Sequence, residues 1–182
     1  SELKEQGAEV VSREFDVTIE AQVKDFFQLA VETYGKLDIL LNLPGLSMVA
    51  NIWQMELDEY KTLMDVNVTG SFLCTKYFVP SASEKGGQII NIGSMAAKRA
   101  NANAPIYCTA KAAVNMFSDG LALQLKKKDI RVTTLNPGPI DSGFWGERDV
   151  PREKFMKPSD MAGVIIFVLQ NDTRVVFHEV NF

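Results

Sequence analysis

The stretch GQIINIGS, residues 87–94, decides the fold class. Its centre is almost entirely apolar and rich in β-branched residues, which is typical of a strand that is buried on both faces. Residues 37–45 (LDILLNLPG) and 130–138 (IRVTTLNPG) have the same character and end at a Pro-Gly pair. Helical patterns separate these strands along the chain. The alternation predicts an α/β fold, a doubly wound parallel sheet in three layers with helices on both faces.

The helical patterns are recognised by apolar residues that recur with a period near 3.6. The first runs over residues 23–34 and ends at Gly35, and a longer one runs from about 57 to 79 and ends at Pro80. Two more helices each begin at a proline, which suits the first turn of a helix. We expect these two helices over residues 105–128 and 158–170, with further strands over 8–18 and 174–180.

The chain has the size and composition of one domain. Its 182 residues are 46% hydrophobic and 23% charged, with a net charge of −4, and we expect a single domain over residues 1–182. The irregular stretch 141–158 is too long for an ordinary connection, and Phe144 and Trp145 are unusual for a solvated loop. We therefore predict a substrate or lid loop at 141–158.

Charge and cysteine content exclude several classes of protein. The short basic run Lys126–Lys128 has no aromatic neighbours and no second cluster, so nucleic acid is not an expected partner. No apolar stretch approaches the roughly 20 residues of a membrane span. Cys74 and Cys108 form neither a metal-ligand spacing nor a disulfide framework. We expect a cytoplasmic protein with no membrane partner and no metal site.

Three residues suggest a chemistry for the site. Tyr107 and Lys111 are four residues apart and share a helix face. A nearby ammonium group lowers the pKa of a phenol, so the tyrosine can pass a proton to or from a substrate oxygen. The hydroxyl of Ser94 can hydrogen-bond the same oxygen as its charge changes. This arrangement suits the interconversion of a carbonyl and an alcohol, for which a nicotinamide cofactor must supply the hydride.

Taken alone, a Tyr-x-x-x-Lys spacing also fits an exposed helix face. With NIGS (91–94), YCTAK (107–111) and NPGPIDS (136–142) in this order, the chain resembles the short-chain dehydrogenase/reductase family over essentially its whole length. The resemblance implies that Tyr107 is the catalytic acid and base, and that Ser94 polarises the substrate carbonyl. It implies that Lys111 lowers the pKa of the tyrosine and holds the nicotinamide ribose. It also implies that Asn67 in DVNVTG positions a water molecule in a proton relay.

The resemblance also implies which residues contact the cofactor and the substrate. The cofactor is NADP or NAD, with NADP slightly favoured on family frequency. The substrate is a small-molecule carbonyl or alcohol, next to Ser94, Phe144 and Trp145. The implied cofactor-binding residues are Asp16, Val17, Asn42, Gly45, Tyr107, Lys111, Pro137, Gly138, Ile140 and Ser142.

The sequence departs from the family pattern in two places. The usual NNAG reads NLPG at residues 42–45, where the proline removes a backbone N–H. No glycine-rich phosphate turn follows a strand near the start of the sequence. The family's strand order is 3-2-1-4-5-6-7, so the first two strands are absent from the printed sequence. We therefore expect an N-terminally incomplete record of a longer chain.

Two functions remain open. One is an NAD(P)-dependent oxidoreductase, and the other is a non-catalytic binding or scaffold protein that keeps the fold but lacks the phosphate-binding turn. The lone His178 gives little support to a Ser-His-Asp hydrolase. The family's long helices, here about 57–79 and 105–126, pair between subunits. The resemblance therefore implies a homodimer or homotetramer, with Phe72, Tyr77, Val114 and Phe117 available for the contact.

Overall fold

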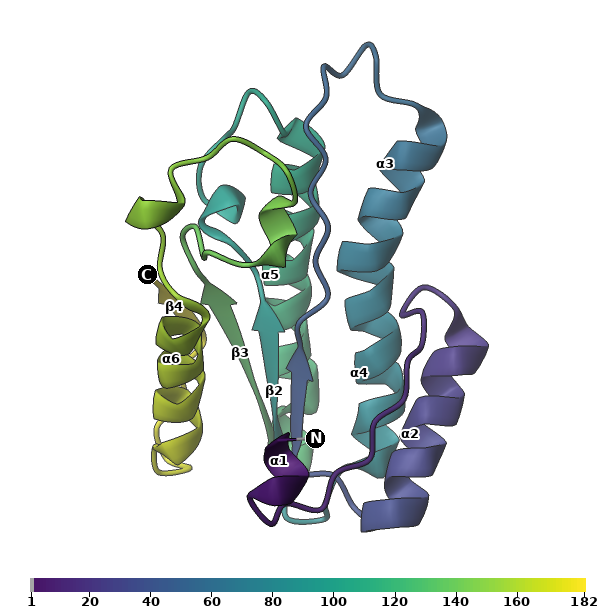
Figure 1. The fold of residues 1–182 in the computed structure, drawn as a ribbon. Helices are drawn as coiled ribbons and strands as arrows, with labels where there is room; N and C mark the ends of the chain where they lie inside the picture. The colour runs from purple at the N-terminus through teal and green to yellow at the C-terminus, as the bar shows by residue number, and fades with distance from the viewer. Residues whose placement is uncertain (1) are drawn as a thin grey trace.

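The computed structural model describes residues 2–182 and contains one parallel sheet of four strands, ordered β1-β2-β3-β4 (Figure 1). The predicted parallel arrangement is confirmed, and the order agrees with the 4-5-6-7 end of the expected sheet. Ile90 of β2 lies between Leu41 of β1 and Thr133 of β3. The strands are β1 (Ile39–Asn42), β2 (Gly87–Ile92), β3 (Ile130–Asn136) and β4 (Glu179–Asn181).

The helices lie close to their predicted positions. The long helix predicted over 57–79 is divided by a π-helical turn, Asp65–Thr69, and passes Pro80 by one residue. Among the described residues, no helix is long and apolar enough to cross a membrane. The α-helices are α1 (Glu2–Glu5), α2 (Glu20–Tyr34), α3 (Leu57–Met64), α4 (Gly70–Ser81), α5 (Pro105–Leu125) and α6 (Pro158–Gln170).

Helices cover both faces of the sheet, as the apolar strands predict. Ile89 and Val132 face one core, where residues of α2, α4 and α5 pack. The neighbouring side chains, Ile90 and Leu135, point to the opposite face and pack with α6. This alternation follows from the period of two along a strand. Figure 1 shows α5 running along β2 and β3, with α4 and α2 on one side and α6 on the other.

The prediction of a strand over residues 8–18 is wrong. This segment is extended but pairs with no strand among the described residues. Its polar groups find other partners, since the Tyr34 hydroxyl accepts from the Val11 N–H at 2.8 Å and donates to the Glu9 carbonyl at 3.2 Å. A strand needs a neighbour for its backbone groups, and local β propensity alone does not supply one.

Burial differs between the strands. The prediction that apolar strands are buried on both faces is confirmed for β2 and β3. It fails for β1, where Ile39 is 49% and Leu41 37% exposed. Only β2 pairs with β1 within residues 2–182. The last strand begins at Glu179, later than predicted, because its paired register with β3 starts at Thr134 and Glu179.

A chain of buried amides joins β1, β2 and α5. The Asn42 amide donates to the Asn91 side-chain oxygen at 2.8 Å, and the Asn91 amide donates to the Ser118 hydroxyl at 2.8 Å. All three side chains are buried. Because a buried polar group is costly when it lacks a partner, this chain fixes how α5 sits on the sheet.

We predict that Asn91→Ala lowers the free energy of unfolding by about 2–4 kcal/mol, because it leaves two buried partners unsatisfied and opens a small cavity. Urea denaturation measures this change. Gln28→Ala is the control, since it removes only an exposed bond to Glu32 and should shift stability by less than about 0.5 kcal/mol. Equal effects of the two changes would contradict the role of the amide chain.

Candidate active site

A cavity of about 1000 Å³ lies at the carboxyl ends of β2 and β3. It is the position where doubly wound sheets bind ligands, and its size suits a small-molecule site. The strand arrows in Figure 1 point towards the loops that enclose it. Of the four residues predicted to be catalytic, Ser94, Tyr107 and Lys111 line this cavity.

One side chain of β3 and the backbone of its own loop hold Ser94 in place. Its N–H donates to the side-chain oxygen of Asn136 at 2.9 Å, and its hydroxyl accepts from the N–H of Ala96 at 3.0 Å. The second bond makes Ser94 the N-cap of a short 3₁₀ turn, Met95–Ala97. Ser94 is therefore fixed by the end of β3 as well as by its own loop.

Lys111 is buried at 3% exposure, and its ammonium group donates to the carbonyl of Ile92 at 2.9 Å. The ammonium lies 5.9 Å from the centre of the Tyr107 ring. Burial lowers the pKa of Lys111 to about 8, because a charged group loses its hydration there. An ammonium group has three donors, so two remain for a ligand after the bond to Ile92.

The pKa of Tyr107 corrects one expectation. The sequence predicted that Lys111 lowers it, whereas burial raises the pKa of Tyr107 above its ordinary value. The Ser94 hydroxyl and the Arg148 charge partly oppose this rise. The Ser94 hydroxyl accepts from the Ala96 N–H and keeps its own O–H free to donate. Tyr107 is therefore protonated at neutral pH and can donate a proton to a carbonyl oxygen.

Asn67 lies behind the cavity wall and not on it. It is fully buried within the π-helical turn, and its amide donates to the carbonyls of Leu46 and Leu63, each at 2.8 Å. A Cβ built on Gly45 would lie 3.6 Å from the Lys111 ammonium and 3.9 Å from the Asn67 oxygen. Gly45 lines the cavity. Because it has no side chain, the backbone at Gly45 fits close to both Lys111 and Asn67. Such π turns are frequent at functional sites.

Three predicted cofactor residues, Asp16, Val17 and Asn42, do not line this cavity. The Asp16 carboxylate accepts the N–H and hydroxyl of Thr18, and these bonds lower its pKa. Val17 packs against Gly70, where a Cβ would lie 2.8 Å from its methyl group. Asn42 belongs to the buried amide chain. In this structure all three support the fold around the site.

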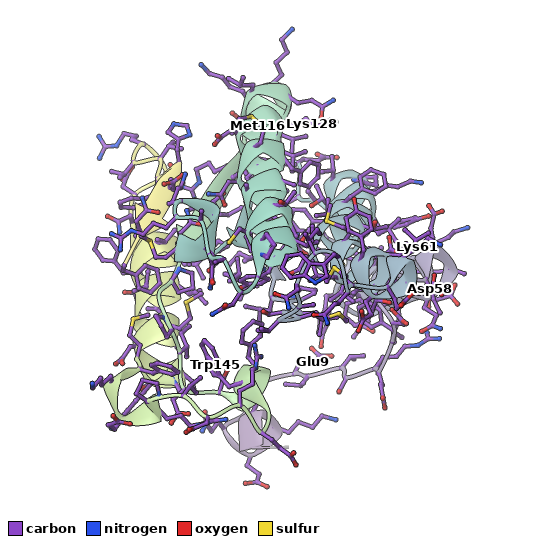
Figure 2. All side chains as sticks on the ribbon, turned by 90° about the horizontal axis from the view of Figure 1, so that it is seen from above. Glu9, Asp58, Lys61, Met116, Lys128 and Trp145 are labelled. Atoms are coloured by element: carbon purple, nitrogen blue, oxygen red, sulfur yellow. The ribbon has the colours of Figure 1, made fainter. Side chains whose placement is uncertain are left out.

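The loop over residues 141–158 is ordered by specific contacts. Ile140 and Met156 form a bridge at its base, and the Trp145 indole donates to the Ile140 carbonyl at 2.7 Å. The rings of Phe144 and Tyr107 lie 5.9 Å apart. Figure 2 looks down on this loop, where Trp145 is labelled. The predicted residues that line the cavity from this side are Pro137, Gly138, Ile140, Ser142, Phe144 and Trp145.

Several residues of the site were not predicted from the sequence. Asn136 fixes Ser94, and a Cβ on Gly93 would collide with the Asn136 amide, so only glycine fits there. Asn136 stands in the NPG stretch, so its position before the proline was a usable signal. Arg99 and Arg148 also line the cavity, but nothing in the sequence places them near Tyr107. The described residues contain no cluster of histidine, cysteine or carboxylate side chains that suits a metal ion.

Comparison with known proteins agrees with this geometry. A family model described as "short chain dehydrogenase" matches residues 1–152. An uncharacterised oxidoreductase of Staphylococcus saprophyticus is 31% identical over 166 residues, which cover 91% of this chain and 71% of the relative. One from Staphylococcus aureus (strain MRSA252) is 30% identical, with coverage of 91% and 72%.

Solved structures are also similar. An alcohol dehydrogenase from the archaeon Thermococcus sibiricus, complexed with 5-hydroxy-NADP, superposes with a TM-score of 0.91 at 25% identity, covering 99% of this chain and 77% of the other. A blue fluorescent protein from a metagenomic library, in complex with NADPH, gives 0.90 at 27% identity with the same coverage. The chain belongs to the short-chain dehydrogenase family. It is an oxidoreductase of that family.

We predict that Lys111→Met stabilises the fold at pH 7. A drop in pKa from 10.5 to about 8 disfavours the charged form by about 3 kcal/mol. The lost bond to Ile92 offsets part of this, which leaves a gain of about 1–2 kcal/mol. Between pH 8 and 10.5 the unfolded chain holds the proton that the folded chain releases, so wild-type stability rises with pH in that window. The difference in the free energy of unfolding between Lys111→Met and the wild type should therefore shrink as the pH rises from 8 to 10.5.

Urea denaturation at pH 7 and pH 10 measures this difference. Lys76→Met is the control, because Lys76 is an exposed partner of Glu20, and it should give no gain at either pH. A loss of stability in Lys111→Met at pH 7 would show that the ammonium is not held at a desolvation penalty.

Proposed function

We propose that the protein interconverts a carbonyl and an alcohol by NAD(P)-dependent hydride transfer, with Tyr107 as the acid and base. The observation that carries this proposal is the meeting of Ser94, Tyr107 and Lys111 in one cavity at the carboxyl end of the sheet. A hydroxyl, a phenol and an ammonium at one place suit a reaction in which an oxygen gains or loses a proton. The loop after β2 supplies Ser94, and α5 supplies Tyr107 and Lys111.

In reduction, the protonated Tyr107 donates its proton to the substrate oxygen while Ser94 hydrogen-bonds that oxygen. The Ser94 hydroxyl and Arg148 favour the phenolate that results, since both lower the pKa of Tyr107. In oxidation the phenolate takes the proton back. The nicotinamide, when bound, supplies or accepts the hydride. Phe144 and Trp145 close the cavity on the loop side and limit the access of water.

The residues present fit the nicotinamide end of a dinucleotide. Lys111 has two free donors for ribose hydroxyls, and the absence of a side chain at Gly45 keeps the space beside its ammonium open. Pro137, Gly138, Ile140 and Ser142 form the wall that we assign to the nicotinamide. We assign Asp16, Val17 and Asn42 to the adenine side, as the family resemblance implies.

We favour NADP over NAD. Two structural neighbours are complexed with 5-hydroxy-NADP and NADPH, and this supports the dinucleotide that carries the additional 2′-phosphate. The alternative function, a scaffold protein without catalysis, leaves unexplained why a phenol and an ammonium are both held in a cavity. The two free cysteines, Cys74 and Cys108, fit the reducing cytoplasm that we propose as the location.

We predict that Tyr107→Phe lowers kcat by at least about 10³-fold, because the proton donor is lost while the ring and its packing remain. Assays of NADPH oxidation with a panel of ketones and aldehydes measure this change. NADPH binding, followed by cofactor fluorescence, should change less than about twofold. Tyr60→Phe is the matched control, since Tyr60 lies on α3 away from the cavity. Full activity in Tyr107→Phe would disprove the mechanism.

We also propose a homodimer or homotetramer that pairs the long helices of neighbouring subunits. The residues named for this contact need correction, because Val114 is buried at 1% exposure and Tyr77 and Phe117 pack against the core. Phe72 remains exposed on α4. The strongest support now comes from α5, where Met116 is 71% and Leu123 80% exposed (Met116 is labelled in Figure 2).

We predict that the double change Met116→Glu and Leu123→Glu converts the assembly to monomers, because it places charge in an apolar contact. Sedimentation velocity at micromolar concentration measures the mass. Ile52→Glu with Trp53→Glu is the matched control, because these apolar side chains are 56% and 79% exposed but lie outside both helices. An unchanged mass in the α5 variant would remove this interface.

A further inference from the structure

The charges that line the cavity are all positive. Arg99, Lys111 and Arg148 line it, and no aspartate or glutamate does. The chain as a whole has a net charge of −4, so this concentration of cations runs against the composition. Lys111 belongs to the catalytic group described above, and Arg148 also lowers the pKa of Tyr107. Neither arginine yet has a role in holding the substrate.

Arg148 is held rigidly in the loop and keeps donors free. Its guanidinium donates to the carbonyls of Phe144 and Trp145. It also lies 5.3 Å from the Phe144 ring centre and 5.1 Å from that of Trp145. These contacts use two of its five N–H groups. Three donors therefore remain on a group whose position is already fixed, which reduces the entropy lost when it binds an anion.

No carboxylate neutralises Arg148 in the described structure. Glu147 and Asp149 flank it in sequence, yet neither forms an ion pair with it. Arg152, in the same loop, does pair with Asp141 at 2.9 Å. The loop thus contains one arginine that a carboxylate satisfies and one that is directed to the cavity without such a partner.

Arg99 supplies a second cation from a different element. It follows the 3₁₀ turn that Ser94 begins, and its side chain is exposed. Within residues 2–182 its guanidinium makes no hydrogen bond and no ion pair, whereas the adjacent Lys98 pairs with Glu179 at 2.6 Å. The two unpaired arginines therefore border the cavity that holds Ser94 and Tyr107.

We propose that Arg99 and Arg148 bind an anionic group of the substrate, so that the protein acts on carbonyl compounds that carry a carboxylate or a phosphate on an apolar body. A guanidinium binds either oxyanion with two parallel hydrogen bonds. Phe144 and Trp145 offer the adjoining apolar surface. The inference rests on the proposed function, and it specifies the class of substrate for the same site.

The first experiment compares an acid with its neutral analogue in turnover. The probes are 3-benzoylpropanoate, its methyl ester and phenacyl phosphate, each with saturating NADPH at pH 7 and constant ionic strength. We expect kcat/KM to be at least about tenfold higher for one of the anions than for the ester, which corresponds to a charge-assisted hydrogen bond. The better of the two anions identifies the carboxylate or the phosphate as the preferred group.

Variants test whether the arginines produce this preference. Arg99→Gln should raise KM for the anion about tenfold while KM for the ester stays within twofold. Arg148→Gln also removes a charge that acts on Tyr107, so its readout is the ratio of kcat/KM for the anion to kcat/KM for the ester, which should fall about tenfold. Arg99→Gln has no hydrogen bond to lose, so it remains informative if Arg148→Gln disturbs the loop. Arg174→Gln is the matched control, because it removes the same charge from an exposed pair with Asp172. Equal loss in this control would overturn the proposal.

A binding experiment separates this inference from the proposed function. Calorimetry compares 4-phenylbutanoate with 4-phenylbutanamide in the presence of NADPH, and neither compound reacts. We expect the acid to bind about tenfold more tightly. Absence of turnover with every carbonyl would overturn the proposed function alone, whereas equal affinity for acid and amide would overturn the anion site. If the arginine variants bind NADPH more weakly but still prefer the acid to the amide, this result would also overturn the anion site.

Discussion

The structure depends on one buried amide at the carboxyl end of the sheet. Asn136, fully buried, accepts from the Ser94 N–H and donates to the side chain of Asn181 at 3.0 Å. It therefore joins the ends of β2, β3 and β4 at the place where the cavity opens. Because a buried amide has few alternative partners, it fixes the backbone of Ser94 to within the tolerance of a hydrogen bond. The same position of the Asn136 amide brings it so close to Gly93 that no side chain fits at residue 93.

The site combines burial with charge, and its acid–base behaviour follows from both. Burial raises the pKa of Tyr107 and lowers that of Lys111, so both groups are pushed towards their neutral forms. Perturbed groups of this kind cluster where chemistry occurs. Arg99 and Arg148 add positive charge to the cavity lining, in keeping with the proposed anion site, and Arg148 also favours the phenolate form of Tyr107. In the proposed mechanism, catalysis and substrate choice thus depend on the same electrostatic surroundings.

Much of the fold was predictable because its signals are local. The apolar stretches at residues 37–45, 87–94 and 130–138 predicted β1, β2 and β3, and prolines marked the starts of α5 and α6. The failure at residues 8–18 has a physical reason, since strand propensity becomes a strand only beside another strand. In the site, Tyr107, Lys111 and Ser94 were predictable from their spacing on recognised elements, and the structure brings them together.

The sequence by itself determined the class of fold, the family and the candidate reactive groups, because these follow from periodicity and from residues at fixed spacing. Tertiary structure decided how those groups behave. It raised the pKa of Tyr107 through burial, placed Asn67 behind the cavity, and directed Asp16, Val17 and Asn42 into the fold around it. It also brought Arg99 and Arg148 to one opening. Burial and proximity depend on which elements pack together, and no local pattern of residues specifies that.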